Sequence, residues 1–324
     1  MKTAQITTLG GPTSLELVDA PSPDPGTTNV LIDVRAAGVA FPEVLQSRGL
    51  YQVKPDLPFI PGAEVAGTVA AAPEGSGLAV GQRVAALPLL GGFAEQVACS
   101  PDAVFPIPDS LSYEAAAAIP FNYLTAHFAL LHRGRLAAGE SVLVHGAAGG
   151  IGSAAIQVAK AFDAGRVIAV TSTEEKGEAA VAAGADEYVL ADSFREAVTA
   201  TTGGKGVDIV VDPVGGDRFT DSLRSLATDG RALVVGFTAG SIPEVKVNRL
   251  LLNNLDVVGV AWGAYALARP GYLQRQWAHL LPKIEAGFIE PLIGETYPLD
   301  RVTDALLSID ERRAVGKILL GIRD

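Results

Sequence analysis

A glycine-rich turn between an apolar run and a helix-forming run carries the clearest chemical signal of the chain. Residues 142–146 are apolar apart from a histidine, and the turn that follows reads Ala147-x-Gly149-x-x-Gly152. Missing side chains let the backbone approach a pyrophosphate closely, and the N-terminus of the helix that begins there stabilises its negative charge. A tight turn is the simpler explanation of glycines alone, but the strand–turn–helix context predicts a dinucleotide site.

The next apolar run, residues 166–171, indicates which dinucleotide binds. In NAD enzymes this strand usually ends with an acidic residue that holds the ribose 2′-hydroxyl group, whereas here it ends at Thr171 with no acid. Lys176 follows shortly after, where its ammonium group can pair with a 2′-phosphate. Two glutamates just before it oppose this interpretation, although acids at a helix start often only complement the helix dipole. A solvated helix lysine is the alternative for Lys176, and we expect NADPH.

The other polar residues give no metal site and no catalytic triad. Cys99 is the only cysteine, and the four histidines, at positions 127, 132, 145 and 279, lack the spacing of metal ligands. The histidines at 127 and 145 lie in apolar contexts, which favours a place in the core or beside a cofactor over a catalytic role. The chemistry therefore has to rely on a bound cofactor and on positioning.

The elements that must position these residues differ between the first third of the chain and the rest. Up to about Ser110, short apolar runs are separated by turns rich in Gly and Pro, which predicts a β-rich domain. Beyond Ser110, strands that are apolar on both faces alternate with helices, which predicts a doubly wound parallel sheet. The expected strands are 141–146, 166–171, 207–212, 231–236 and 255–260, and the expected helices are 121–132, 149–162 and 174–183. Two more helices, 272–286 and 302–309, and two strands, 293–297 and 316–321, are expected to fold back on the first third.

Composition and charge narrow the class of protein. The 324 residues suggest two domains, and 48% hydrophobic residues are enough for large cores. A net charge of -11 repels phosphate backbones and anionic lipids, so we expect no nucleic acid and no membrane partner. The longest apolar stretch, 111–131, is interrupted by polar residues and a proline, and the N-terminus does not look like a signal peptide. We expect a cytoplasmic protein.

Several segments, in order along the whole chain, resemble the zinc-free medium-chain dehydrogenases/reductases, and in particular the NADPH:quinone oxidoreductase (zeta-crystallin-like) family. They are residues 36–43, 48–51, 61–67, 91–95, 147–152, 207–216 and 316–320. The resemblance implies an α/β fold with a GroES-like β-rich catalytic domain, 1–118 and 265–324, and a Rossmann NADPH-binding domain, 119–264. It also implies a homodimer that pairs the edge strands at 255–260, since an unpaired apolar edge invites aggregation.

The resemblance also implies site residues. Those expected to bind the cofactor are Thr125, Ala148, Gly149, Gly150, Ile151, Thr171, Lys176, Gly236, Phe237 and Lys317. Those expected to line the substrate pocket are Ala40, Phe41, Tyr51, Tyr123 and Trp262. Tyr51 is the candidate catalytic residue, because a phenol can position a carbonyl oxygen or act as an acid. An ordinary packing role is the alternative for Thr125, Gly149, Ile151, Lys176, Gly236, Phe237 and Lys317, and for the aromatic residues Tyr123 and Trp262.

The departures from the family pattern concern metal binding and two contacts. Zinc enzymes of the superfamily have a cysteine where Ala40 or Phe41 stands and a histidine where Ala63 stands, so we expect no zinc. Glu64, which follows, is expected to be a structural carboxylate. Ala40 also stands where the quinone oxidoreductases often have an asparagine, and Ala191 where they often have a cofactor-contacting tyrosine.

We expect a metal-independent enzyme that transfers hydride from NADPH to a quinone or a similar flat electrophile in the interdomain cleft. Two alternatives stay open: an enal or enoyl-thioester (alkene) reductase of the same superfamily, and a non-enzymatic NADPH-binding protein. The partner expected in either enzymatic case is a small-molecule electron acceptor.

Overall fold

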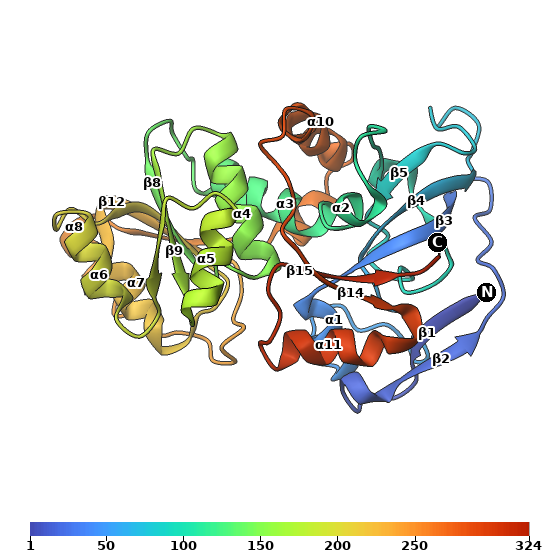
Figure 1. Cartoon of the computed structure of the whole chain (residues 1–324), viewed down its shortest axis with the longest axis horizontal. Helices are drawn as coiled ribbons and strands as arrows, with labels where there is room; N and C mark the ends of the chain where they lie inside the picture. Colours follow the sequence, from blue (N-terminus) through green and yellow to red (C-terminus); the bar gives the residue numbers. More distant parts are fainter. Residues whose placement is uncertain (324) are drawn as a thin grey trace. The chain divides into compact units, whose positions relative to one another are not determined.

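The computed structural model describes residues 1–323, which form two compact units (Figure 1). Unit 1 comprises Met1–Phe121, Leu273–Ala278 and the residues from Ile293 onward, and unit 2 comprises Asn122–Tyr272 and His279–Leu292. Residues 265–272 and 279–292 thus group with unit 2, whereas the sequence places all of 265–324 in the catalytic domain.

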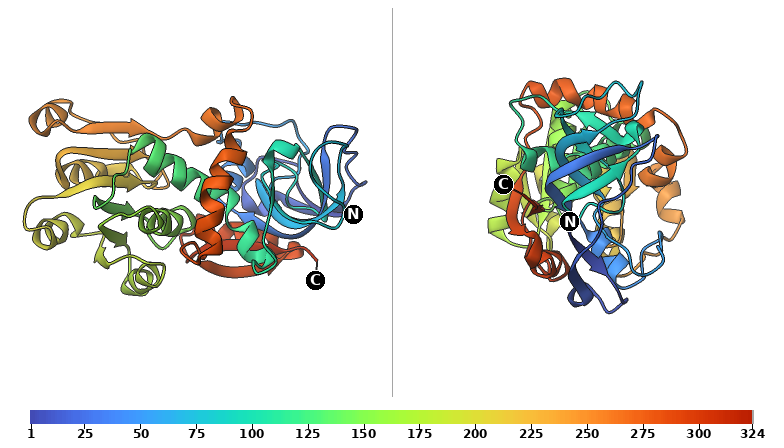
Figure 2. Two further views of the ribbon diagram at one scale, coloured as in Figure 1. Left: turned by 90° about the horizontal axis from the view of Figure 1, so that it is seen from above. Right: turned by 90° about the vertical axis from the view of Figure 1, so that its right-hand side faces the viewer.

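Unit 1 is built on a curved, mainly antiparallel sheet in the order β14-β15-β3-β4-β5-β7, with β6 paired to β3, beside a separate ribbon of β1 and β2. The strands are β1 (Lys2–Ile6), β2 (Leu15–Asp19), β3 (Val30–Val39), β4 (Glu64–Ala71), β5 (Arg83–Ala86), β6 (Gln96–Cys99), β7 (Val104–Pro106), β14 (Ile293–Pro298) and β15 (Lys317–Gly321). Because β15 pairs antiparallel with β3, the chain's last segment does fold back on its first third. The blue and cyan strands of this unit form a curved sheet in Figure 2.

The helices of unit 1 are few and short. They are α1 (Phe41–Ser47), α2 (Tyr113–Ala117) and α11 (Val302–Asp310), with 3-10 turns η1 (Pro12–Ser14), η2 (Pro101–Ala103) and η5 (Leu299–Arg301). The long strand β3 alternates buried and half-buried residues before its buried end, as expected for a sheet with one covered face. A Cβ atom at Gly67 would lie 2.0 Å from the Asp33 carbonyl oxygen, so glycine is required where β3 and β4 approach most closely.

Unit 2 is a six-stranded, all-parallel sheet in the order β10-β9-β8-β11-β12-β13. Its strands are β8 (Ser141–His145), β9 (Arg166–Thr171), β10 (Glu187–Leu190), β11 (Val207–Asp212), β12 (Leu226–Val234) and β13 (Asp256–Gly259). This order confirms the predicted doubly wound sheet. The chain runs outward from β8 to β10 and then resumes at β11 on the other side of β8, and ligands of such sheets bind at the carboxyl ends of the strands at this switch point.

The helices of unit 2 follow its strands along the chain. They are α4 (Gly150–Ala161), α5 (Glu174–Ala182), α6 (Phe194–Thr201), α7 (Phe219–Arg224), α8 (Asn248–Asn253) and α9 (Trp262–Leu267), with the turn η4 (Gly216–Arg218). Two further helices have residues in both units. α3 (Pro120–His127) begins in unit 1 and continues into the π-helical turn η3 (Phe128–Arg133), and α10 (Tyr272–Glu285) begins in unit 2 and contributes its Leu273–Ala278 stretch to unit 1. The sequence missed β10, a short edge strand without an apolar run, and it began β12 five residues late, because Asp229 and Gly230 look like a turn.

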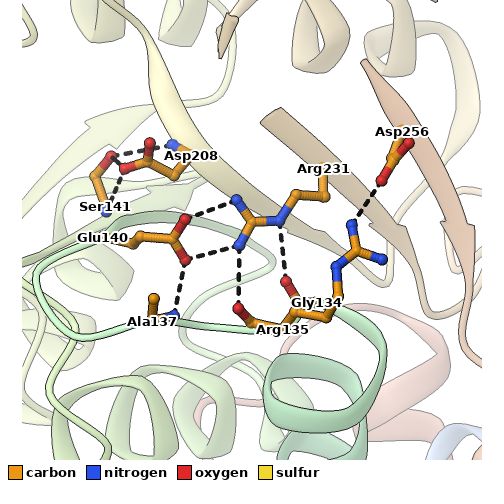
Figure 3. A network of polar contacts seen from close by, with 8 residues as sticks. All are labelled: Gly134, Arg135, Ala137, Glu140, Ser141, Asp208, Arg231 and Asp256. Atoms are coloured by element: carbon orange, nitrogen blue, oxygen red, sulfur yellow. Dashed lines mark hydrogen bonds and ion pairs between the residues drawn. The ribbon is translucent and has the colours of Figure 1, made fainter. Parts of the chain in front are cut away.

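A buried arginine fixes the loop that precedes β8 (Figure 3). The Arg231 guanidinium donates to both carboxylate oxygens of Glu140, at 2.8 and 2.7 Å, and its Nε donates to the Gly134 carbonyl at 3.0 Å. Glu140 in turn accepts from the Ala137 amide at 2.9 Å. Since bidentate charged pairs are geometrically specific, this network fixes the conformation of the loop at the start of β8. It therefore helps to position the strand that leads to the glycine turn.

Candidate cofactor and catalytic site

The glycine turn after β8 has the shape that a pyrophosphate needs. Gly146 has φ +58°, and the amide of Gly149, the N-cap of α4, donates to the Gly146 carbonyl at 3.0 Å. A Cβ atom at Gly152 would lie 2.2 Å from that same carbonyl oxygen, so only glycine lets the helix pack this closely. No side chain caps α4, which leaves the amide groups of its first turn available to an anion. These residues therefore fit a dinucleotide.

Beneath this turn lies a buried histidine that is held neutral. His145, the last residue of β8, has its Nε2 2.9 Å from the Ser222 hydroxyl, and Phe194 packs edge-on against its ring. Burial lowers the pKa of His145, and the neighbouring Asp212 carboxylate opposes this only in part. Asp212 itself accepts from the amides of Val214 and Gly215, both at 2.8 Å, and so shapes the turn after β11. The His145 side chain is 3% exposed.

The carboxyl end of β9 leads directly into α5. The buried Thr171 hydroxyl donates to the Thr173 carbonyl at 3.1 Å, and the Thr173 hydroxyl caps α5 by accepting from the Lys176 amide at 3.3 Å. Lys176 is half-buried in the first turn of this helix. The Ala191 amide, just beyond β10, donates to the Thr171 carbonyl at 2.8 Å. Thr171, Lys176 and Ala191 thus lie around one strand end.

The remaining predicted residues of unit 2 differ in exposure. Gly236 and Phe237 follow β12, where the Gly236 amide contacts the Asp212 carbonyl at 3.4 Å and the Phe237 ring is 37% exposed. Tyr123 is buried, and its hydroxyl donates to Gln157 at 2.7 Å, so that hydroxyl already has a partner. Trp262 is buried at the start of α9, and Thr125 is half-buried on α3.

Unit 1 holds three buried ionisable side chains near the residues predicted to line a pocket. Lys317, on β15, forms an ion pair with Glu64 Oε1, and the two side chains are only 3% and 1% exposed. Glu64 Oε2 also accepts from the Phe121 amide at 2.7 Å. Glu43, on α1, accepts from the Ala40 amide at 2.9 Å and from the Ala63 amide at 3.1 Å.

These charges interact across the buried cluster. Burial raises the pKa of Glu43 to about 7, the Glu64 charge adds to this rise, and the Lys317 ammonium and two amide contacts oppose it. Two carboxyl groups and one ammonium group out of water favour one bound proton, because a net buried charge is costly. Burial, and then the Glu43 charge, raise the pKa of the half-buried Tyr51. Tyr51 is therefore a neutral phenol, able to donate, at physiological pH.

Metal-binding side chains do not gather in the described part of the chain. Across residues 1–323, no group of three or more His, Cys, Asp or Glu side chains is arranged to hold a metal ion. The two closest histidines, His127 and His279, form a pair at 2.8 Å between ring nitrogens. By the family resemblance, Ala40 or Phe41, and Ala63, stand at the positions where zinc enzymes have ligands. None of the helices within these residues is long and apolar enough to span a bilayer.

One feature that sequence reasoning missed is a pocket of about 330 Å³ at the carboxyl end of β10. Its lining comprises Ala191, Asp192, Phe194, Arg195, Glu196, Arg218 and Asp221. No local spacing could reveal it, because the topology of the sheet brings together the segment that follows β10 and the segment that follows β11.

Comparisons with known proteins agree with this architecture. The alcohol dehydrogenase GroES-like domain family matches residues 26–109, and the zinc-binding dehydrogenase family matches residues 150–285. Quinone oxidoreductase-like protein 2 of Mus musculus is 38% identical over 325 residues, which cover 99% of this chain and 92% of that protein.

Two solved structures extend the likeness to three dimensions. A probable oxidoreductase from Mycobacterium abscessus is 43% identical with a TM-score of 0.91, and 99% of each chain is covered. The quinone oxidoreductase from Thermus thermophilus, studied also as a complex with NADPH, is 36% identical with a TM-score of 0.86, covering 99% of this chain and 100% of that one. The predicted fold and family are confirmed: the chain belongs to the quinone oxidoreductase family of the medium-chain dehydrogenases/reductases.

Proposed function

We propose that the protein is an NADPH-dependent, metal-independent reductase that transfers hydride to a quinone or a similar flat electrophile. The observation that carries the proposal is the glycine turn after β8, where a Cβ atom at Gly152 would meet the Gly146 carbonyl at 2.2 Å. The NADPH complex of the related Thermus thermophilus enzyme supports the choice of cofactor. The absence of an acidic residue at the end of β9 supports it independently.

The residues that would hold NADPH follow from the ends of the strands. The turn at Ala148, Gly149, Gly150 and Ile151 would bind the pyrophosphate through its amide groups. Thr171 and Lys176 would bind the adenosine ribose and its phosphate. Thr125, Gly236 and Phe237 would contact the nicotinamide end. For Lys317, the buried ion pair with Glu64 supports a structural role in unit 1.

When bound, NADPH supplies the hydride, and the protein contributes position, exclusion of water and one proton donor. We assign the donor role to Tyr51, whose phenol is kept protonated by burial and by the Glu43 charge. Its hydroxyl would donate to an acceptor oxygen while charge develops there. Ala40, Phe41, Tyr123 and Trp262 remain the proposed walls of the substrate pocket. The methyl groups of Ala40 and Ala63 offer no lone pair to a metal, which supports metal independence.

The test is an assay of cofactor oxidation by chelator-treated protein, monitored as the loss of NADPH or NADH absorbance. We expect turnover of a small quinone with NADPH, much slower turnover with NADH, and no loss after chelation. Activity with a conjugated enal alone would replace the proposal by an alkene reductase. Tight NADPH binding without turnover of any acceptor would leave a non-enzymatic NADPH-binding protein.

We also propose a homodimer that pairs β13 with its symmetry mate. β13 is an edge strand of the unit 2 sheet, and Val257 on it is 39% exposed. On the preceding helix, Leu251 and Leu252 are 78% and 75% exposed, an apolar surface that a second copy would cover. Light scattering at micromolar protein should give a dimer mass, and Val257→Lys should give a monomer. A monomeric mass for the unaltered protein would reject the proposal.

The unpaired Cys99 thiol, buried in unit 1, suits a reducing compartment. We therefore propose a cytoplasmic location, which fractionation of the native host would test.

A further inference from the structure

Four apolar side chains are exposed on unit 1 around the loop that contains Tyr51. These side chains, the apolar patch, are 50%, 68%, 55% and 44% exposed and belong to Leu9, Leu50, Val53 and Leu57. Leu50 directly precedes Tyr51, and Val53 follows two residues after it. A single exposed leucine needs no explanation, but a contiguous apolar patch marks an interaction site.

Contacts at the end of α1 place Leu9 beside Leu50. The Gly11 amide donates to the Ser47 carbonyl at 3.0 Å, so the segment after β1 runs along the last residues of this helix. Gly49, at φ +67°, follows the helix, and a Cβ atom there would lie 2.7 Å from Leu9 Cδ1. The Leu9 side chain therefore covers the residue that precedes Leu50, and it can do so only because that residue is a glycine.

The far end of the loop returns to the same segment. Ile6 and Phe59 form an antiparallel bridge, in which the Ile6 amide donates at 2.8 Å and the Phe59 amide donates at 3.2 Å. Because the two segments run in opposite directions, the residues before Phe59 lie opposite those after Ile6, and Leu57 lies on the side of Leu9. The loop therefore begins and ends against residues 6–11, and the patch is built from both segments.

The backbone beneath the patch is ordered, and the charges near it are balanced. The Leu50 amide donates to the Leu45 carbonyl at 2.9 Å, which fixes the start of the loop on the end of α1. A ligand that covers an ordered surface loses less of its binding energy to conformational entropy. The two charged residues of the loop, Lys54 and Asp56, are exposed and opposite in sign, so the patch favours an uncharged apolar ligand over an ion.

We propose that the apolar patch binds the hydrocarbon tail of the electron acceptor while its ring lies at Tyr51, so that the preferred substrates are quinones with an alkyl or isoprenoid side chain. The inference rests on the proposed function, which places the acceptor oxygen at the Tyr51 hydroxyl. Because Leu50 and Val53 flank Tyr51, a chain that leaves the ring there meets these two side chains first. Four apolar residues are too few for a stable protein interface, which takes about 20–30 residues a side, but they are enough for a flexible chain.

The test compares two quinones that differ only in their tails, a methyl-substituted and a hexyl-substituted benzoquinone. The ratio of their kcat/KM values with NADPH cancels any general effect of a substitution on hydride transfer. We expect the unaltered protein to favour the hexyl compound by roughly tenfold or more. The double variant Leu50→Ser with Val53→Ser should lower this ratio by roughly 5- to 10-fold, since it removes two apolar contacts. Val80→Ser, at a valine that is 72% exposed beyond the Ala71 end of β4, is the matched control and should leave the ratio unchanged.

The outcomes separate the inference from the proposed function. If the two quinones have equal kcat/KM values, or if the double variant keeps the ratio of the unaltered protein, the tail site is rejected and the proposed function stands. A ratio that persists while light scattering gives a lower mass for the double variant would make the patch a contact between two copies, and the inference would also fail. If neither quinone is reduced although NADPH binds, the proposed function itself is wrong, and the inference falls with it.

Discussion

Loss of the Lys317 ammonium group should destabilise unit 1 strongly. Lys317 and Glu64 are 3% and 1% exposed, so both charges have lost nearly all their water and depend on each other. Removing one partner of such a pair leaves an uncompensated buried charge, which costs about 3–5 kcal/mol. We therefore expect Lys317→Met to lower the free energy of unfolding by that amount at pH 8.

The double variant Glu64→Gln with Lys317→Met should recover most of this loss. Glutamine keeps an oxygen that can accept from the Phe121 amide, and neither member of the ion pair leaves a charge of its own behind. Because replacing a whole buried pair by neutral groups is often close to neutral, we expect the double variant within about 2 kcal/mol of the unaltered protein. Glu64→Gln alone leaves the ammonium group unpaired and should cost as much as Lys317→Met.

Urea unfolding followed by tryptophan fluorescence measures these differences. Trp277 stacks on Phe105 with ring centroids 4.8 Å apart in unit 1, and it is the only reporter once Trp262 of unit 2 is replaced by phenylalanine. A cost below about 1 kcal/mol for Lys317→Met would refute the reasoning. If the same variant then bound NADPH much more weakly, Lys317 would have the cofactor role implied by the family resemblance.

Three further predictions concern pH, the glycine turn and the cysteine. The pKa of Glu43 is about 7 in the folded protein and 4.5 for an ordinary glutamate, so ionisation of this group opposes folding. The loss of folding free energy begins above pH 4.5, is complete above pH 7 and reaches roughly 3 kcal/mol. Glu43→Gln should therefore flatten the dependence of stability on pH between about pH 5 and 8 in urea titrations. Gly152→Ala should abolish measurable cofactor binding in fluorescence titrations, since its methyl group would overlap the Gly146 carbonyl, and unchanged binding would contradict the proposed role of the turn. Cys99, with its pKa raised to about 12 by burial, should resist a thiol reagent at pH 8 until denaturant is added; prompt labelling of the native protein would show that the thiol is not buried.

The sequence predicted features that depend on local patterns. The bounds of β9 and β11 agree with the expected strands residue for residue, because both are buried apolar runs bounded by turn residues. The glycine turn was equally visible, since its geometry depends on a few adjacent residues. By contrast, β10 is a short edge strand whose burial comes from its neighbour β9, and no pattern within the residues of β10 indicates that pairing.

The charged groups show why the rest could not be predicted. Lys317 and Glu64 lie far apart in the sequence, and only the antiparallel pairing of β15 with β3, and of β3 with β4, brings them together. Arg218 lines its pocket because β11 and β10 end at the same edge of one sheet. In each case the order of the strands, which is a non-local property, determines which residue becomes the partner. The neighbouring residues in the sequence are equally compatible with a solvated side chain.

The family resemblance places Ala40 or Phe41, and Ala63, where zinc enzymes have ligands, and this bears on the proposed reaction. A metal ion would link the two chain segments by coordination. Here the Glu43 carboxylate links them, by accepting hydrogen bonds from the amides of both Ala40 and Ala63. The group that links the two segments is thus an anionic or neutral carboxyl group instead of a cation. A carbonyl oxygen beside these methyl groups would gain no polarisation from them, so the proposed function calls for an acceptor that is itself electron-poor. This favours a quinone, or a conjugated carbonyl assisted by Tyr51, over a simple ketone, and turnover of simple ketones at rates equal to those of quinones would contradict it.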